Sequence, residues 1–284
     1  MIPLNQPDAD LFIPDQCDPS TALSRTTHLG IGAHQDDLEF MAFHGIIACY
    51  HAADQWFGGI TCTDGSGSSR TGKYAGCTDE EMMTIRRNEQ REAAVVGHYS
   101  FMAQLDYPSK LVKDPANTTL RDDLIQLIAA AQPEVIYTHN PADKHDTHVA
   151  VVVPVIQAIR ALPKAQRPKR VLGCEVWRGL DWMMDADKVP LDVSAHENLA
   201  MAVSGIFDSQ IGGGKRYDLA TLGRRRANAT FFDSHTSDAA EQLWFAMELT
   251  PLIEDDSLDI VSYVLAYLTR FTDDVRAKLT QRIG

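Results

Sequence analysis

Short apolar runs alternate with segments of helical periodicity through the first two-thirds of the chain. Buried strands are predicted at His28–Ala33, Phe57–Thr63, Glu134–His139 and Val171–Trp177. Helices are predicted at Phe40–Ala53, from Thr78 to Gly97, at Leu120–Ala131 and at Val149–Ala161. This alternation is typical of right-handed β-α-β units, which build a mostly parallel sheet covered by helices on both sides.

The helix that follows Thr78 has the clearest end signals. Thr78 is a candidate N-cap, and Glu81 stands three residues later, as a capping box requires. Gly97 is a natural C-terminal glycine. The segment before it, Asp64–Cys77, is rich in Gly and Ser and is predicted to be a loop.

The last third of the chain has a different pattern. A Met- and Asp-containing loop follows Trp177, then a helix near His196–Phe207, the glycines Gly212–Gly214, a stretch around Phe231, and a C-terminal helix from about Leu258 to Arg282. No internal repeat and no low-complexity linker divides the chain. We therefore predict one α/β domain over residues 1–284, a Rossmann-like three-layer fold with a mostly parallel sheet. It would have an N-terminal extension (1–26), a core (27–178) and a C-terminal elaboration (179–284).

Composition and charge narrow the class of protein. Of the 284 residues, 44% are hydrophobic and 23% are charged, as in an average globular protein. With 26 Lys and Arg against 39 Asp and Glu, the net charge is −13, which argues against binding to a nucleic-acid backbone. The oligomeric state stays open, and a homo-oligomer is compatible with this composition.

The chain carries no pattern for membrane insertion or secretion. Its longest apolar stretch, Val149–Ile159, is about half of a membrane span and contains Pro154. Met1–Thr27 lacks the basic and apolar regions of a secretory leader. Five cysteines without C-x-x-C spacing are typical of reduced thiols that fill the core. A cytoplasmic protein without membrane contact is expected.

Polar segments follow three of the predicted strands, where α/β sheets bind their ligands. They are His34–Glu39, Asp64–Ser69 and His139–His148. The first follows Gly30-Ile31-Gly32, but a dinucleotide site fails there. Gln35 stands at the position of the third glycine, and Asp36 and Asp37 would repel a pyrophosphate.

These segments suit a metal ion instead. Zn²⁺ accepts imidazole nitrogen and carboxylate oxygen, and a catalytic zinc keeps three protein ligands and one open position. His34 and Asp37 supply two ligands, and further candidates follow the strand at Glu134–His139. These are His139, Asp143, His145, Asp146 and His148. Asp36, beside the metal, could take the proton of the attacking water.

These motifs resemble those of the LmbE-like, or PIG-L, zinc-dependent N-deacetylases. The family's A-H-x-D-D-x-E segment corresponds to Ala33–Glu39, and its H-x-D-H segment lies within His139–His148. Thr63-Asp64-Gly65 resembles its T-D-G, and Arg86–Glu89 with Ala93, Ala94 and Gly97 resembles its R-x-x-E…A-A-x-x-x-G helix. The resemblance covers about residues 27–178, and Phe207–Gln210 echoes a family S-Q element.

The resemblance implies a role for each residue at a motif position. His34, Asp37 and His148 would bind Zn²⁺, or another divalent ion. Asp36 would be the general base, and His145, as an imidazolium, would stabilise the oxyanion of the tetrahedral intermediate. A positive charge there would offset the charge that develops on the amide oxygen.

Two positions depart from the family pattern. Gln35 replaces a common proline, and Thr147 replaces the usual aspartate of the second motif. Asp143 or Asp146 would then have to orient His145.

Four further candidates keep two interpretations each. Arg86 could contact substrate or pair with a carboxylate, and Asp64 could contact substrate or belong to a flexible loop connection. Glu39 could act in the site or complement the dipole of the helix. Trp177, with Trp182 and Tyr217, could stack on a sugar or pack in the core. Arg224–Arg226 are predicted to form a solvated helix face.

These inferences predict a zinc-dependent hydrolase that removes an acetyl group from an N-acetylated amino sugar or glycoside. A thiol-conjugate amidase or another linear amidase could use the same site. A third possibility is a metal-binding protein without catalysis, but a structural zinc site usually fills all four positions and needs no spare carboxylate. Asp36 therefore favours an enzyme with a small-molecule N-acetylated substrate.

Overall fold

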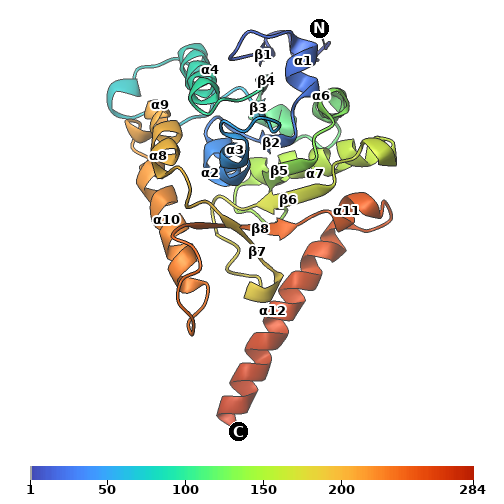
Figure 1. Cartoon of the computed structure of the whole chain (residues 1–284), viewed down its shortest axis with the longest axis vertical. Coiled ribbons are helices and arrows are strands. Elements are labelled where there is room, and N and C mark those ends of the chain that lie inside the picture. The colour runs from blue at the N-terminus through green and yellow to red at the C-terminus, as the bar shows by residue number, and fades with distance from the viewer. Residues whose placement is uncertain (1) are drawn as a thin grey trace.

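The computed structural model describes residues 2–284 and contains an eight-stranded sheet with the order β1-β4-β3-β2-β5-β6-β8-β7 (Figure 1). The strands are β1 (Asp10–Phe12), β2 (His28–Gly32), β3 (Phe57–Thr63), β4 (Phe101–Tyr107), β5 (Val135–His139), β6 (Arg170–Cys174), β7 (Val189–Asp192) and β8 (Leu243–Glu248). Strands β2 to β6 pair in parallel, whereas β1, β7 and β8 pair antiparallel with their neighbours. The predicted α/β fold with a mostly parallel sheet is confirmed.

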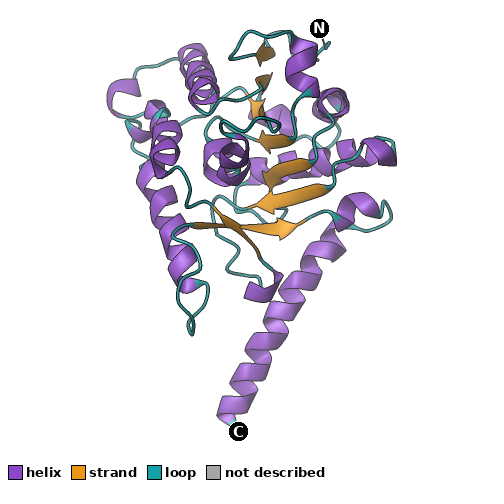
Figure 2. Ribbon diagram, in the orientation of Figure 1, coloured by secondary structure: helices purple, strands orange, loops and turns teal. Residues whose placement is uncertain are grey.

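Helices cover both faces of this sheet (Figure 2). One layer contains α1 (Pro19–Ser24), α5 (Ser109–Val112), α6 (Thr119–Ala131), α7 (Asp146–Ala161) and α11 (Pro251–Glu254). The other contains α2 (Asp37–Met41), α3 (Phe43–Cys49), α4 (Asp79–Val96) and α8 (Glu197–Gly205), extended by α9 (Asp208–Ile211) and α10 (Tyr217–Phe231). The sheet therefore has an apolar core on each face.

Buried thiols belong to this core, as predicted. Cys62 lies in the cluster on one face of the sheet, and Cys49 and Cys174 lie in the cluster on the other. Cys17 and Cys77 are half-buried, and all five cysteines are free thiols.

The elements predicted with the clearest signals are confirmed. Strand β3 has the predicted bounds, and α4 begins after Thr78, whose side chain accepts from the Glu81 amide while the Glu81 carboxylate accepts from the Thr78 amide. Gly97 caps the helix at its other end. The helix predicted to begin at Val149 begins at Asp146 instead, so α7 includes His148 and has His145 at its N-cap.

Other elements differ from the prediction. The helix expected over Phe40–Ala53 is two short helices separated at Ala42. Strands β1, β4, β7 and β8 were not predicted. The last two come from the C-terminal elaboration and complete the sheet, so this part of the chain is continuous with the core.

The C-terminal helix α12 (Ile260–Ile283) extends away from the body of the molecule (Figure 1). Val264 is its buried residue, and Tyr263 anchors the helix by donating to the carbonyl of Glu248 at 2.7 Å. Within residues 2–284, no helix combines the length and the apolar character needed to cross a bilayer.

Candidate metal centre and active site

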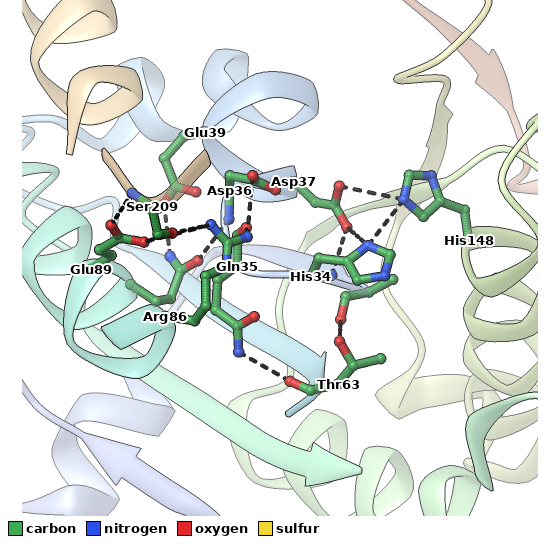
Figure 3. A network of polar contacts seen from close by, with 12 residues as sticks. His34, Gln35, Asp36, Asp37, Glu39, Thr63, Arg86, Glu89, His148 and Ser209 are labelled. Atoms are coloured by element: carbon green, nitrogen blue, oxygen red, sulfur yellow. Dashed lines mark hydrogen bonds and ion pairs between the residues drawn. The ribbon is translucent and has the colours of Figure 1, made fainter. Parts of the chain in front are cut away.

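Three predicted ligands converge at the carboxyl ends of β2 and β5. His34 follows β2, Asp37 begins α2, and His148 lies in the first turn of α7. His34 Nδ1 is 3.3 Å from Asp37 Oδ2 and 3.3 Å from His148 Nε2, and His148 Nε2 is 3.4 Å from Asp37 Oδ1 (Figure 3). The structure therefore brings together the three side chains that the motifs predicted.

The spacing of these donor atoms fits one tetrahedral cation. Two atoms that bind the same Zn²⁺ at about 2.0–2.1 Å lie about 3.3–3.4 Å apart. Two imidazole nitrogens and a carboxylate also form a donor set that zinc prefers. Burial disfavours the charged form of Asp37, but the facing imidazoles of His148 and His139 outweigh this effect and hold its pKa well below the ordinary value.

Asp143 orients one of these ligands. Its Oδ2 lies 3.1 Å from His148 Nδ1, which places the ring proton on Nδ1 and leaves the Nε2 lone pair free to bind a cation. The same carboxylate accepts from the backbone amides of His145 and Val176. The expectation that Asp143 orients the His145 ring is therefore corrected, because this carboxylate holds His148. Asp146 is exposed, and its side chain has no hydrogen bond or ion pair within residues 2–284.

His139 is a neighbour of the cluster. Its ring stacks on His148, with centroids 3.8 Å apart, and its Nε2 accepts from the Ala33 amide at 2.8 Å. His139, Asp143 and His148 also form a compact group of possible ligands. However, the Ala33 amide occupies the Nε2 lone pair of His139, so the group with His34 and Asp37 is the better cation site.

Asp36 lies beside the cluster in an unusual backbone conformation. Its φ is 102°, in the left-handed region, at the N-cap of α2. Burial raises the pKa of its carboxyl to about 6, while the guanidinium of Arg86, 3.2 Å away, opposes this shift. A carboxyl group with such a pKa can exchange a proton near neutral pH.

Arg86 is buried and pairs with carboxylates, which was one of its two interpretations. Besides Asp36, it contacts Glu89 at 3.5 Å and donates to Ser209 Oγ at 3.3 Å and to the carbonyl of Gln35 (Figure 3). Ser209 also donates to Glu89 at 2.6 Å. This network links α4 to α9 and fixes the Arg86 side chain, which still lines the cavity described below.

Glu39 lies in the first turn of α2, where its ionised form would complement the helix dipole. Its Oε1 accepts from Tyr99 Oη at 2.7 Å and from Gln90 Nε2 at 2.8 Å. Burial raises its pKa to about 7. These contacts place Glu39 under the site, outside the cavity lining.

The loop after β3 borders the site, but Asp64 itself points into the loop. Its Oδ1 accepts from the Ser66 amide at 2.9 Å and from Ser66 Oγ at 2.8 Å. Thr63 and Gly65 line the cavity, whereas Asp64 does not. Its carboxylate therefore shapes this loop.

His145 stands between two parallel rings. It stacks on His148 with centroids 4.7 Å apart and on Trp177 with centroids 6.0 Å apart. Burial lowers its pKa to about 4, and the nearby His148 and His34 favour the same direction. This shift favours the neutral ring over the expected imidazolium. The role of His145 at the oxyanion stays a prediction.

A cavity of about 510 Å³ opens over these residues. Its wall includes the side chains of Phe40, Trp177, Tyr217 and Trp244. Trp177 and Tyr217 meet edge to face at 6.1 Å, whereas Trp182 packs against the core. The cavity is large enough for a drug-sized ligand, and its aromatic wall suits a ring.

The arginines of α10 contradict the predicted solvated face. Arg225 is buried, and its guanidinium donates to the carbonyls of Glu39 and Phe40 at 2.8 and 3.2 Å. Arg224 lines the cavity. Arg226 alone of the three is exposed.

Comparison with family models matches residues 29–159 to PIG-L: GlcNAc-PI de-N-acetylase. These residues are a PIG-L family domain. The matched segment includes His34, Asp36, Asp37, His145 and His148 and ends within α7. The resemblance of the motifs is therefore confirmed. A comparison with curated proteins gave no match.

Solved structures share the fold at low sequence identity. The conserved protein TT1542 from Thermus thermophilus has a TM-score of 0.61 and 19% identity, over 78% of this chain and 94% of that one. The N,N'-diacetylchitobiose deacetylase from Pyrococcus horikoshii has a TM-score of 0.62 and 15% identity, over 81% and 86%. GalB, the 4-carboxy-2-hydroxymuconate hydratase from Pseudomonas putida, has a TM-score of 0.57 and 17% identity, over 78% and 95%. A deacetylase and a hydratase thus share this fold, so the reaction has to be argued from the site.

Proposed function

We propose that this protein is a zinc-dependent N-deacetylase that releases acetate from an N-acetylated amino sugar or glycoside. One observation carries the proposal. Asp36, a buried carboxyl group with a pKa of about 6, lies in the same cavity as three donors spaced for one cation. A structural metal site needs no such acid, whereas amide hydrolysis does.

The chain's own ligands to the ion would be His34, Asp37 and His148. When bound there, Zn²⁺ supplies Lewis acidity toward the amide carbonyl and the attacking water. Asp143 keeps the Nε2 lone pair of His148 directed at the site, since it accepts the Nδ1 proton.

Asp36 would move the proton in both halves of the reaction. It accepts a proton from the attacking water and returns it to the nitrogen of the leaving amine. Arg86, 3.2 Å away, favours the ionised form of Asp36 that begins the cycle. Because Arg86 is itself buried and fixed, the carboxylate is held in one orientation.

His145 would donate an N–H to the amide oxygen as negative charge develops on it. A neutral imidazole can supply this hydrogen bond, so the low pKa is compatible with the role. Its ring is held by stacking on His148 and Trp177. No carboxylate among residues 2–284 hydrogen-bonds this ring, so stacking is the contact that orients it.

The test measures free amine and acetate from N-acetylated sugars, with thiol-conjugate and simple linear amides in the same panel. Zinc-loaded protein should release both products from a sugar, and Asp36→Asn should lower kcat by about 10²–10⁴-fold while zinc content stays unchanged. Asp54→Asn makes the same chemical change at an exposed position and should leave kcat unaltered.

The outcomes separate the alternatives. If only a thiol conjugate is cleaved, the protein is a thiol-conjugate amidase that uses the same site. A protein that binds zinc but cleaves none of the amides, or an Asp36→Asn variant with normal turnover, would refute the proposal.

A further inference from the structure

The charges that line the cavity differ in sign from the charge of the whole chain. The net charge of the protein is −13, yet the wall contains three basic side chains, Arg86, Lys113 and Arg224. Its only carboxylates among residues 2–284 are Asp36 and Asp37. Arg86 neutralises Asp36, and Asp37 belongs to the cation site. Two positive charges of the wall are therefore left uncompensated.

Neither of these two cations has an acidic partner. In the part of the chain that the structure describes, no ion pair includes Lys113 or Arg224. This is not a general property of α10, since the nearby Arg226 pairs with Glu197. A cationic wall in an acidic protein attracts anions to the cavity, whereas most of the surface repels them.

The partners of Arg224 fix its position but do not neutralise its charge. Its guanidinium donates to the carbonyl of Val176 and, at 3.3 Å, to the carbonyl of Trp177. Main-chain carbonyls align the guanidinium but carry no net charge. A guanidinium has five N–H donors, so Arg224 keeps further donors for a ligand.

The location of Arg224 relates it to the proposed reaction. It holds the backbone of Trp177, whose ring stacks on His145. Val176, Trp177 and Arg224 all line the cavity on the side where β6 ends. A substrate whose amide lies at His145 and Asp36 would extend its remaining part along Trp177 toward Arg224.

We propose that Arg224 binds an anionic group of the substrate, a phosphate or a carboxylate, at the β6 side of the cavity. This inference rests on the proposed function for the amide, but the anion site itself depends only on the wall residues. A planar guanidinium binds either group through two parallel hydrogen bonds. Lys113, on the α5 side, adds to the positive potential without being required for contact.

Binding measurements can test this without turnover. The protein would be the zinc-loaded Asp36→Asn chain, titrated calorimetrically with N-acetylglucosamine, its 6-phosphate and N-acetylmuramic acid, which carries a carboxylate on its 3-O-lactyl group. At least one anionic sugar should bind about 10-fold more tightly than the neutral sugar, as a charge-assisted bidentate contact would give. Arg224→Gln in the same background should reduce that affinity to the value for the neutral sugar, and Arg224→Lys should retain part of the difference. The matched control Arg226→Gln, at an exposed position of the same helix, should keep the full preference.

Several results would overturn the anion site. They are equal affinities for neutral and anionic sugars, no binding of either anionic sugar, and a preference that survives Arg224→Gln, as direct contact of the anion with the metal would give. Failure of the reaction would look different. If sugars release acetate but bind with no preference for an anion, the deacetylase is supported and the anion site is refuted. If the preference depends on Arg224 but no acetate is released, the anion site is supported and the deacetylase is refuted.

Discussion

At the level of single residues, the polar side chains of the site are held by specific partners. Asp36 has Arg86, and His148 has Asp143. The left-handed backbone at Asp36 costs of order 1–3 kcal/mol in a residue other than glycine. The contacts of the two adjacent carboxylates indicate why this conformation is kept, because it directs Asp36 toward Arg86 and Asp37 toward His34 and His148.

Two histidines three positions apart should respond differently to truncation. His148→Ala should remove most of the bound zinc, since Nε2 of His148 is one of the three clustered donors. His145→Ala should retain zinc and lower kcat, because its ring only stacks on His148 and meets His34 edge to face, and it is not one of the three clustered donors. The zinc content per chain, measured on dialysed protein by mass spectrometry, distinguishes a metal ligand from a residue that acts only on the substrate. If both variants lose zinc equally, His145 is a ligand and its assigned role fails.

The motifs predicted the cluster of candidate metal ligands because these residues occupy fixed positions after the strands. They did not predict the partners of those ligands. Thr147 stands where the family has an aspartate, and no pattern in the sequence indicates that Trp177 stacks on the His145 ring. Likewise, Asp143 or Asp146 was expected to orient the His145 ring, yet the Asp143 carboxylate contacts the His148 ring and Asp146 is exposed. Such partners depend on tertiary packing.

At the level of elements, the sequence predicted the strands that read as continuous apolar runs. Strand β4 was missed because Gln104 and Asp106 interrupt its apolar pattern. In the structure Gln104 is buried and donates to the carbonyl of Arg87, and Asp106 pairs with Arg87. Arg224–Arg226, which lie in α10, were predicted to form a solvated helix face for a related reason. An arginine run is usually exposed, and only the fold shows that Arg225 is buried and donates to carbonyls of α2.

Arg225→Met should therefore cost stability although it introduces an apolar side chain of similar length. The change leaves two buried carbonyls, those of Glu39 and Phe40, without their donor. Hydrogen bonds to charged groups contribute about 1.5–3 kcal/mol, and the free energy of unfolding in urea should fall by about that amount.

The neighbouring Arg226→Met provides the control, since Arg226 is exposed and its ion pair with Glu197 is partly solvated. It should change the free energy of unfolding by less than about 1 kcal/mol. Similar losses in both variants would mean that the carbonyl contacts of Arg225 do not matter for stability.

For the whole molecule, the candidate metal centre and the wall of the cavity come largely from different parts of the chain. The PIG-L segment, residues 29–159, contains the candidate cation ligands and Asp36. Trp177, Tyr217 and Arg224 lie after this segment, and all three line the cavity. The C-terminal part also contributes β7 and β8 to the sheet. It therefore stabilises the fold while it builds the wall against which the rest of a substrate would lie.

Global stability should also depend on Glu175, which follows β6. Its Oε2 accepts from the Leu180 amide at 2.7 Å, whereas its Oε1 is buried with no hydrogen-bond partner within residues 2–284. Burial raises its pKa to about 7, above an unfolded value of about 4.3. The folded state thus keeps the proton to higher pH than the unfolded state does. The resulting stabilisation is present at low pH and is lost as pH rises from about 4.3 to about 7.

Glu175→Gln removes this titration while it keeps the size of the side chain. The difference in Tm between Glu175→Gln and the wild type should therefore shift in favour of the variant between about pH 5 and about pH 8, as measured by differential scanning calorimetry. Because the variant and the wild type are compared at the same pH, the effects of the other titrating groups on Tm cancel. Glu241→Gln, at an exposed position, should show the same difference at both pH values. If the Glu175→Gln difference also stays constant, the buried carboxyl is ionised over the whole range and its pKa is not raised.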